Sequence, residues 1–460
     1  MLSSTVSLAP FESRRAPAVD DYADSYSPMT PVPPDFLVPL LTRPVAILGG
    51  GVSGQAVREL LALLGAREEI FDEQHGIGTA RGFTPAEARR HSLVVFSPGF
   101  SPGHAWLQTA RAAGCTCLGE LDFASLFWRG RLIAVTGTNG KTTLTEFLTH
   151  ALTAAGEDAY AVGNVGFPFS RLITFKRDAD EDAVALCEVS SFQAETLQHF
   201  HADATLWTNF AEDHLERHPG LAAYFAAKWN LLERTRTGAV FAGTSVQRFA
   251  REFGRKLPPE AGVSSEGAAP DPQLAGTIFA NYPQRENFLL ALAWWRHEGR
   301  PEAELYAAAR TFTLGRHRLT RIGELHGVSF WNDSKATNFH AVEAALATFA
   351  APVHLIAGGR AKGGDLLAFI QRIAGQTKHV WLIGETRTVL ATYCAAHRVP
   401  HTVCGTLEKA VDGAGATARS GDHIVLSPGF ASFDMFRGYA DRGNQFEKLV
   451  SNLGATSTFQ

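Results

Sequence analysis

A short glycine-rich loop carrying a lysine lies between an apolar segment and a segment of helical apolar periodicity. It reads Gly137-Thr138-Asn139-Gly140-Lys141-Thr142-Thr143. Backbone N–H groups at a helix N-terminus bind phosphate, the lysine adds a mobile positive charge, and the Thr142 hydroxyl can reach Mg²⁺. The common phosphate-loop pattern places four residues between its glycines, whereas only Thr138 and Asn139 separate them here. We therefore expect residues 137–143 to bind a nucleoside triphosphate.

Three further groups able to do chemistry follow this loop in the sequence. Glu188 ends an apolar segment, where nucleotide-binding α/β domains place a carboxylate for Mg²⁺, and with Thr142 it makes a minimal set of oxygen ligands. His214 follows the next apolar segment. Most strand-end carboxylates and lone histidines have only a structural role. Glu188 and His214, however, are expected on the same sheet edge as Lys141, which favours a role in a functional site.

Lys228 lies in an apolar helical context, Tyr-Phe-Ala-Ala-Lys-Trp-Asn. One interpretation is that its ammonium group reaches solvent along an apolar surface. The other is a buried, neutral amine that reacts with CO₂ and becomes a carbamate, an anion able to bind a cation. The residues leave both open.

A second glycine-rich segment lies near the N-terminus. Gly49, Gly51 and Gly54 match the dinucleotide fingerprint, and Asp72 follows about 20 residues later. The glycines can serve only a tight turn, or they can bind the diphosphate of a nucleotide sugar or of a dinucleotide. The last case would suit a nicotinamide-dependent oxidoreductase, and the sequence alone does not separate the three.

The last third of the chain carries several anion-binding candidates. There are two interpretations of the basic segment Arg316-His317-Arg318: its arginines contact phosphate or ribose, or it is a linker exposed to solvent. Residues 333–338 place five hydrogen-bonding side chains at a strand-to-helix turn, more than a helix cap requires. Lys362 lies in the glycine-rich turn 358–364, which suits an anion.

Alternating strands and helices must position these groups. The expected strands lie at 44–48, 69–71, 93–96, 132–136, 184–189, 204–209, 328–331, 353–356, 380–383 and 423–426. This alternation predicts an α/β protein with parallel sheets, in which ligands bind beyond the carboxyl ends of the strands. We expect a disordered or loosely docked tail over residues 1–36, followed by three domains. These are an N-terminal Rossmann-like domain over residues 37–129, a central P-loop ATPase-like domain with a mainly parallel sheet over 130–315, and a C-terminal Rossmann-like domain over 316–460.

Composition narrows the classes of partner. The chain has 460 residues, a net charge of −4 and 45% hydrophobic residues, so neither nucleic acid nor a membrane is expected as a partner. Five cysteines without zinc-finger spacing indicate free thiols in a reducing compartment. We expect a cytoplasmic monomer.

From about residue 40 to its end, the chain resembles the ATP-dependent Mur ligases of peptidoglycan synthesis. The shared motifs are Gly137–Thr143, Gly163-Asn164-Val165-Gly166, Glu188-Val189-Ser190-Ser191-Phe192-Gln193, Asp213-His214-Leu215 and Lys228. Within the family it most resembles members that add D-glutamate to UDP-N-acetylmuramoyl-L-alanine. That likeness rests on Ser97-Pro98-Gly99, His317-Arg318, residues 332–338, Lys362 and residues 426–446.

The resemblance implies a reaction through an acyl phosphate, with two Mg²⁺ ions and a carbamylated Lys228. It implies catalytic roles for Lys141, Glu188, His214 and Lys228, and metal contacts for Thr142, Glu188, His214 and Lys228. ATP would contact Gly137, Thr138, Asn139, Gly140, Lys141, Thr142, Thr143, Asn287, Arg318 and Asp333. The UDP-sugar substrate and glutamate would contact Val52, Ser53, Asp72, Ser97, Gly99, Asn164, Ser190, Gln193, Lys335, Thr337, Lys362, Ser432 and Phe433. The same fold with L-glutamate or another amino acid is an alternative.

Overall fold

The computed structural model describes residues 31–73, 80–176, 181–264, 269–454 and 456–457. It contains three sheets, two entirely parallel and one mainly parallel, and confirms the predicted three-domain α/β class. Most of the predicted tail lies outside the described residues. Within the tail's last part Phe36 stacks on His199, and Leu37 beside it is buried in a core.

The first sheet has the strand order β2-β1-β3-β4, and all its strands are parallel. Strands β1 and β3 are buried along their whole length, which explains their unbroken apolar sequence. The fourth strand, which the sequence analysis did not predict, holds the buried thiol of Cys117. The elements are η2 (Leu40–Thr42), β1 (Val45–Leu48), α1 (Val52–Leu63), β2 (Glu68–Phe71), α2 (Pro85–Ala88), β3 (Leu93–Phe96), α3 (Ala105–Ala112), β4 (Thr116–Gly119) and α4 (Glu120–Ser125).

The second sheet has the order β6-β7-β5-β8-β9 and is also parallel. Strand β5, which leads into the phosphate loop, is central, and β6 and β9 at the edges were not predicted. The elements are β5 (Arg131–Thr136), α5 (Lys141–Ala154), β6 (Ala159–Gly163), α6 (Phe169–Lys176), β7 (Val184–Glu188), α7 (Ser191–Ala194), β8 (Ala202–Trp207), α8 (Leu221–Leu232), β9 (Thr235–Ala242), α9 (Thr244–Glu252), η3 (Pro259–Ala261), η4 (Pro272–Leu274), α10 (Gln284–His297) and α11 (Glu302–Thr311).

The third sheet has the order β14-β13-β12-β15-β11-β10-β16. Its pairs are parallel except that β10 runs antiparallel to β11 and β16, a hairpin edge that the sequence analysis did not predict. The elements are β10 (Thr320–Leu325), β11 (Val328–Asn332), α12 (Phe339–Leu346), β12 (Val353–Ala357), α13 (Leu366–Ile373), η5 (Ala374–Gln376), β13 (Thr377–Leu382), α14 (Arg387–Ala396), β14 (His401–Val403), α15 (Leu407–Thr417), β15 (His423–Leu426), α16 (Tyr439–Asn452) and β16 (Thr456–Ser457).

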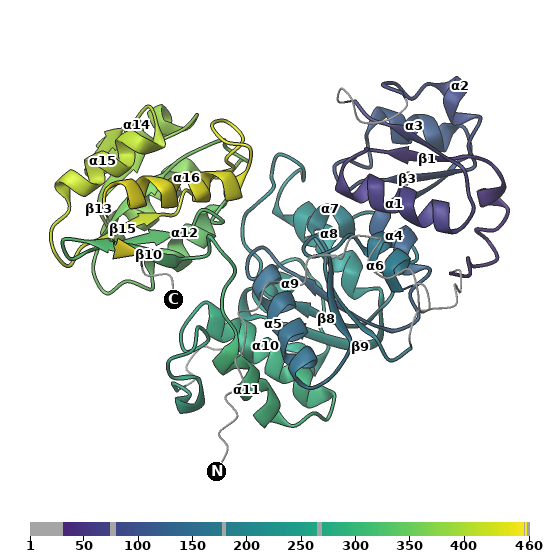
Figure 1. The fold of residues 1–460 in the computed structure, drawn as a ribbon, viewed down its shortest axis with the longest axis horizontal. Helices are drawn as coiled ribbons and strands as arrows, with labels where there is room; N and C mark the ends of the chain where they lie inside the picture. Colours follow the sequence, from purple (N-terminus) through teal and green to yellow (C-terminus); the bar gives the residue numbers. More distant parts are fainter. Residues whose placement is uncertain (1–30, 74–79, 177–180, 265–268, 455, 458–460) are drawn as a thin grey trace, which may run out of the picture.

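The first two domains share one apolar core. It runs from Ile47 on β1 through Phe123 on α4 and Phe169 on α6 to Cys187 on β7, and α4 and α6 lie between the two sheets in Figure 1. The ion pair between Arg171 and Glu59 ties α6 to α1 at 2.7 Å. The third domain lies on the other side of the central one (Figure 1), and its cores are its own. Among the described helices, none has the length and apolarity that crossing a membrane requires.

Candidate active site

The phosphate loop follows β5 directly and needs its two glycines. Gly137 and Gly140 have φ of 150° and 80°, where glycine is favoured. A Cβ on Gly137 would lie 1.9 Å from the Thr208 hydroxyl oxygen, and one on Gly140 would lie 2.8 Å from Oδ1 of Asn287. The close approach of Asn287 brings one predicted ATP residue to the loop.

Two lysines meet at one carbonyl oxygen of this loop. Lys141 Nζ and Lys228 Nζ each donate to the Gly137 oxygen at 2.8 Å. Burial lowers the pKa of Lys141, and the nearby Glu188 only partly opposes that shift. Burial and the Lys141 charge together place the pKa of Lys228 well below its ordinary value. Since Lys228 is 1% exposed, the interpretation in which it reaches solvent is wrong.

Glu188 lies beside the loop because β7 pairs with β5. Val135 and Gly163 are its partners in the neighbouring strands. Its Oε1 accepts from Asn164 Nδ2 at 2.7 Å, while its Oε2 is buried and lacks a hydrogen-bond partner. Within the described ranges no three His, Cys, Asp or Glu side chains converge on one point as a cage. A buried carboxylate oxygen left open next to a phosphate loop nevertheless fits a hard cation such as Mg²⁺.

His214 lies beyond the end of β8 on the same sheet edge. Its φ of 55° is unusual for a residue with a side chain and marks a constrained turn. Nδ1 donates to Oε1 of Glu216 at 3.1 Å, and Nε2 lies 3.6 Å from Oδ2 of Asp213. Burial lowers the pKa of His214 even though Asp213 opposes the shift. The lowered pKa favours the neutral imidazole, and the predicted contact of His214 with a metal ion stays a prediction.

The predicted nucleotide residues of the third domain lie at its junction with the second. Asp333 Oδ1 accepts from the Leu319 N–H at 3.1 Å, and Oδ2 accepts from the Ser427 hydroxyl at 2.7 Å. Burial raises the pKa of Asp333 to about 7, against the opposing charge of Arg318. Arg318 also acts on the partly buried Glu146 of α5, the helix that begins at the loop. Arg318 therefore lies near both Asp333 and α5, while contacts of Arg318 and Asp333 with ATP stay predictions.

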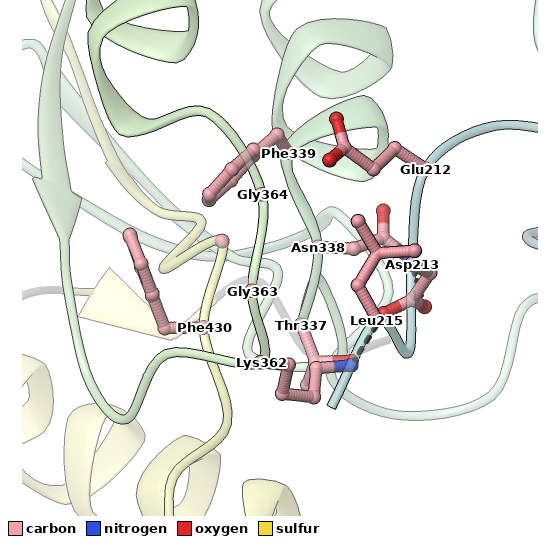
Figure 2. Close-up of a pocket in the computed structure, with 11 residues that line it drawn as sticks. Glu212, Asp213, Leu215, Thr337, Asn338, Phe339, Lys362, Gly363, Gly364 and Phe430 are labelled. Atoms are coloured by element: carbon pink, nitrogen blue, oxygen red, sulfur yellow. Dashed lines mark hydrogen bonds and ion pairs between the residues drawn. The ribbon is translucent and has the colours of Figure 1, made fainter. Parts of the chain in front are cut away.

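A pocket opens between the second and third domains. Figure 2 shows Lys362 and Thr337 at one end, facing Asp213, with Phe339 and Phe430 forming an apolar side. Lys362 Nζ lies 2.9 Å from Oδ1 of Asp213. Burial raises the pKa of Asp213, but Lys362 and His214 outweigh it and hold that pKa below its ordinary value. A lysine, hydroxyl and glycine-rich backbone suit a small anionic ligand.

The other residues predicted to hold the amino acid lie outside the pocket lining. Ser432 is buried just beyond Phe430, and the following Phe433 is 66% exposed. Lys335 Nζ stands 3.9 Å from the centre of the Tyr439 ring, a cation–π contact. The structure therefore brings together Thr337 and Lys362, while contacts of the remaining three with a substrate stay predictions.

The predicted residues of the first domain gather at the carboxyl edge of its sheet. Asp72 Oδ2 accepts from the Gly50 N–H at 2.6 Å, and the Ser97 hydroxyl donates to the Gly49 oxygen at 3.3 Å. Val52, the first residue of α1, is 68% exposed, and Ser53 follows it on the same helix turn. A glycine-rich turn at a helix N-terminus with an exposed apolar residue is open to a phosphate-bearing ligand.

Ser190 and Gln193 have a local structural role. They form a capping box at the start of α7. The Gln193 backbone N–H donates to the Ser190 hydroxyl oxygen at 3.3 Å, and Oε1 of Gln193 accepts from the Ser190 backbone N–H at 2.9 Å. Gln193 is buried. Their side chains are therefore occupied in this structure, and their predicted contact with the substrate stays a prediction.

Two arginines that the sequence analysis did not assign hold the site together. Arg217 donates to the backbone oxygens of Gly99 at 3.4 Å and of Phe100 at 3.2 Å, so it joins the central domain to the first. Arg442 is 1% exposed and donates to the Ser334 oxygen at 2.8 Å and the Phe430 oxygen at 3.2 Å. Gly99 lies 118 residues from Arg217 and Ser334 lies 108 residues from Arg442, and no local motif reveals contacts over such separations.

The fold and site define a class: a three-domain α/β protein with a phosphate-type loop on its central domain and a pocket containing Lys362 between that domain and the third. Family models support a narrower assignment. Residues 135–277 match the Mur ligase middle domain, and residues 317–430 match the glutamate ligase domain of Mur ligases.

Relatives of known name extend the match over most of the chain. A UDP-N-acetylmuramoylalanine–D-glutamate ligase of Gloeobacter violaceus is 37% identical, with 89% of this chain and 99% of that protein covered. Proteins of the same name from Desulfatibacillum aliphaticivorans and Chlamydia pneumoniae are 34% and 33% identical, with 88% and 89% of this chain and 91% and 99% of theirs covered. The chain belongs to the Mur ligase family and, within it, to these UDP-N-acetylmuramoylalanine–D-glutamate ligases.

Solved structures agree in fold. A UDP-N-acetylmuramate-alanine ligase of Thermotoga maritima aligns with a TM-score of 0.56 at 14% identity, over 89% of this chain and all of that one. A pseudomurein peptide ligase type C of Methanothermus fervidus aligns with a TM-score of 0.55 at 14% identity over the same shares. Because the family consists of ligases, the oxidoreductase alternative for residues 49–54 is set aside.

Proposed function

We propose that this protein is an ATP-dependent carboxylate–amine ligase of peptidoglycan synthesis. It joins D-glutamate to UDP-N-acetylmuramoyl-L-alanine and releases ADP and phosphate. One observation carries the proposal: Asp213, close enough to act on Lys141 of the phosphate loop, also pairs with Lys362 of the pocket. A carboxylate activated at the loop thus lies beside a lysine suited to an acidic amino acid. The names of the relatives support glutamate as that amino acid.

The first step makes the substrate carboxylate reactive. One of its oxygens attacks the γ-phosphorus of ATP, the bond from that phosphorus to the bridging oxygen breaks, and ADP leaves. Lys141 and the backbone N–H groups of residues 140–143 neutralise the charge that spreads over the transferring group. Asn287, Arg318 and Asp333 hold the nucleoside on the other side of the loop.

The second step forms the amide. The amine of glutamate, having given a proton to water, attacks the acyl carbon, and a tetrahedral intermediate forms. The bond from that carbon to the phosphate oxygen then breaks and phosphate leaves. Thr337, Lys362, Lys335, Ser432 and Phe433 position glutamate, and closure of the third domain excludes water from the acyl phosphate.

We also propose two Mg²⁺ sites. Thr142 and Glu188 would hold one ion, and Glu188, His214 and a carbamylated Lys228 would hold the other. The open Oε2 of Glu188 supports a cation at this point. Bound magnesium supplies positive charge to the phosphate oxygens.

The burial of Lys228 supports the proposed carbamate. A neutral amine is the form that attacks CO₂, and the carbamic acid produced loses a proton to become an anion. The lowered pKa of Lys228 supports that neutral form. An uncarbamylated ammonium would repel a metal ion, whereas the carbamate would bind it.

The first domain would hold the UDP end of the substrate. Val52, Ser53, Asp72, Ser97 and Gly99 form its edge, and Arg217 fixes the Gly99 turn against the central domain. Asn164, bonded to Glu188, lies where the muramoyl-alanine end would meet the metals. We further propose a cytoplasmic, monomeric protein, since the five free cysteines suit a reducing compartment.

Purified protein tests the function directly. With ATP, Mg²⁺ and UDP-N-acetylmuramoyl-L-alanine, D-glutamate is expected to trigger phosphate release and a product heavier by one glutamyl residue. Lys141→Ala serves as the inactive control. Product with L-glutamate alone would support the alternative amino acid, and phosphate release with neither enantiomer would overturn the proposal.

A further inference from the structure

A pair of amide side chains joins the phosphate loop to the third domain. Asn139 Nδ2 donates to Oδ1 of Asn338 at 3.2 Å, and Asn338 Nδ2 donates back to Oδ1 of Asn139 at 2.9 Å. His340 Nδ1 accepts from Asn139 Nδ2 at 3.0 Å. These contacts connect groups 199 and 201 residues apart in the sequence, and they cross from one domain to the other.

The Asn139 backbone is fixed on the central domain. Its N–H donates to Oδ1 of Asn209 at 2.9 Å, and its carbonyl oxygen accepts from Asn209 Nδ2 at 3.0 Å and from the Thr208 hydroxyl. Only its side chain therefore extends across the junction. A residue that fixes the Asn139 side chain therefore also fixes the outer part of the phosphate loop.

Asn338 uses all of its polar groups at this point. Besides its bonds to Asn139, its Nδ2 donates to Oδ2 of Asp213 at 2.9 Å, and its Oδ1 accepts from the Ala341 N–H at 2.9 Å as the N-cap of α12. The other oxygen of Asp213 holds Lys362 at 2.9 Å. Asn338 is buried and lines the pocket that Figure 2 shows. One side chain thus contacts the loop, the Asp213 turn and the pocket wall.

We propose that Asn338 is a positioning residue that couples the phosphate loop to the amino-acid pocket. This inference rests on the proposed function. While the Asn139–Asn338 pair is intact, the activated carboxylate and the incoming amine are held in one arrangement. Without it, water reaches the acyl carbon, the carbon–oxygen bond to phosphate breaks, and the starting acid and phosphate are formed. ATP is then consumed without product.

Asn338→Asp separates this role from helix capping. Aspartate caps a helix as well as asparagine does, but it has no amide hydrogens and would face Asp213. The measurement is phosphate released per amide formed, with kcat and the KM for ATP. We expect the ratio to rise from one to about two or more, kcat to fall about tenfold, and the KM for ATP to stay within about threefold.

Two further variants keep the test decisive if Asn338→Asp folds poorly. Asn139→Ala removes the other half of the pair, so the same rise is expected, and the double variant should add little to either single one. Thr406→Ala removes the N-cap of α15 in the same domain, outside the pocket lining, and should lower Tm while the ratio stays at one. A ratio of one with kcat within about twofold in both Asn338→Asp and Asn139→Ala would overturn the inference. Wild-type protein that releases no phosphate with glutamate would instead overturn the proposed function.

Discussion

Lys141 and Lys228 donate to the same carbonyl oxygen, that of Gly137, each at 2.8 Å. Two ammonium groups so close together in a buried site repel each other strongly. The repulsion is relieved when one of them is neutral, and burial together with the Lys141 charge places the pKa of Lys228 well below its ordinary value. Lys141 is needed as a cation for phosphate, so Lys228 is the amine that can be modified.

Lys228→Ala is expected to lower kcat by about a thousandfold or more, because the second metal would lose a ligand. Acetate or formate entering the vacated space should restore part of the activity. Initial rates with and without these anions measure the rescue, and ¹³C NMR of wild-type protein under ¹³CO₂ should show a carbamate signal. Absence of both would rule out the carbamate.

Glu188→Gln keeps an oxygen that can accept from Asn164 but removes the negative charge. We expect the Mg²⁺ concentration that gives half-maximal rate to rise about tenfold, since a neutral amide is a weaker ligand for a hard cation. A magnesium titration of the rate measures this. ADP affinity without metal serves as the control and should stay unchanged; an unaltered magnesium requirement would contradict the assigned ligand.

Lys362→Met should raise the KM for D-glutamate by about fiftyfold or more and leave the KM for the UDP substrate within about twofold. It should also lower Tm, because Asp213 would be a buried charge without its partner. Restoration of Tm, but not of glutamate affinity, in the double variant Lys362→Met/Asp213→Asn separates the two effects. Equal changes in both KM values would argue against a role in the glutamate pocket.

His218 should make the protein less stable in acid. Burial lowers its pKa to about 4 from the ordinary 6.5. The unfolded chain binds a proton below pH 6.5 and the native chain only near pH 4, so stability is full above pH 6.5 and falls as pH drops towards 4. Urea unfolding of His218→Gln, which keeps a polar group near Ser191, should show a shallower fall over that range. The exposed His201→Gln should follow the wild-type curve, and overlap of all three curves would refute the assignment.

Much of the central site could be predicted because its motifs are local. Glu188 and the loop after β5 each follow an apolar strand, and parallel strands bring their carboxyl ends to one edge. The same reasoning located Lys362 at a glycine-rich strand end. This reasoning could not decide whether the Lys228 amine is buried or reaches solvent, because burial depends on how the whole domain packs.

Other features depend on contacts that no short segment contains. The Asn139–Asn338 pair and the hydrogen bond from Arg217 to the Gly99 carbonyl oxygen each join separate domains. Ser190 and Gln193 lie within a recognised motif, yet their spacing equally specifies a capping box, which the structure shows. Strand β10 was missed because it pairs antiparallel at one side of a sheet whose other strands follow the parallel alternation.

Because the first two domains share one apolar core, the three domains form two packed units rather than three. Among the apolar clusters of the described chain, none joins the second domain to the third, and an ion pair between Asp213 and Lys362 connects the two at the pocket. The connection passes through residues 315–319, where His317 and Leu319 have φ of 66° and 45°. A movement of the third domain would therefore turn about this one short segment and would carry Arg318, the proposed nucleotide contact, along with it.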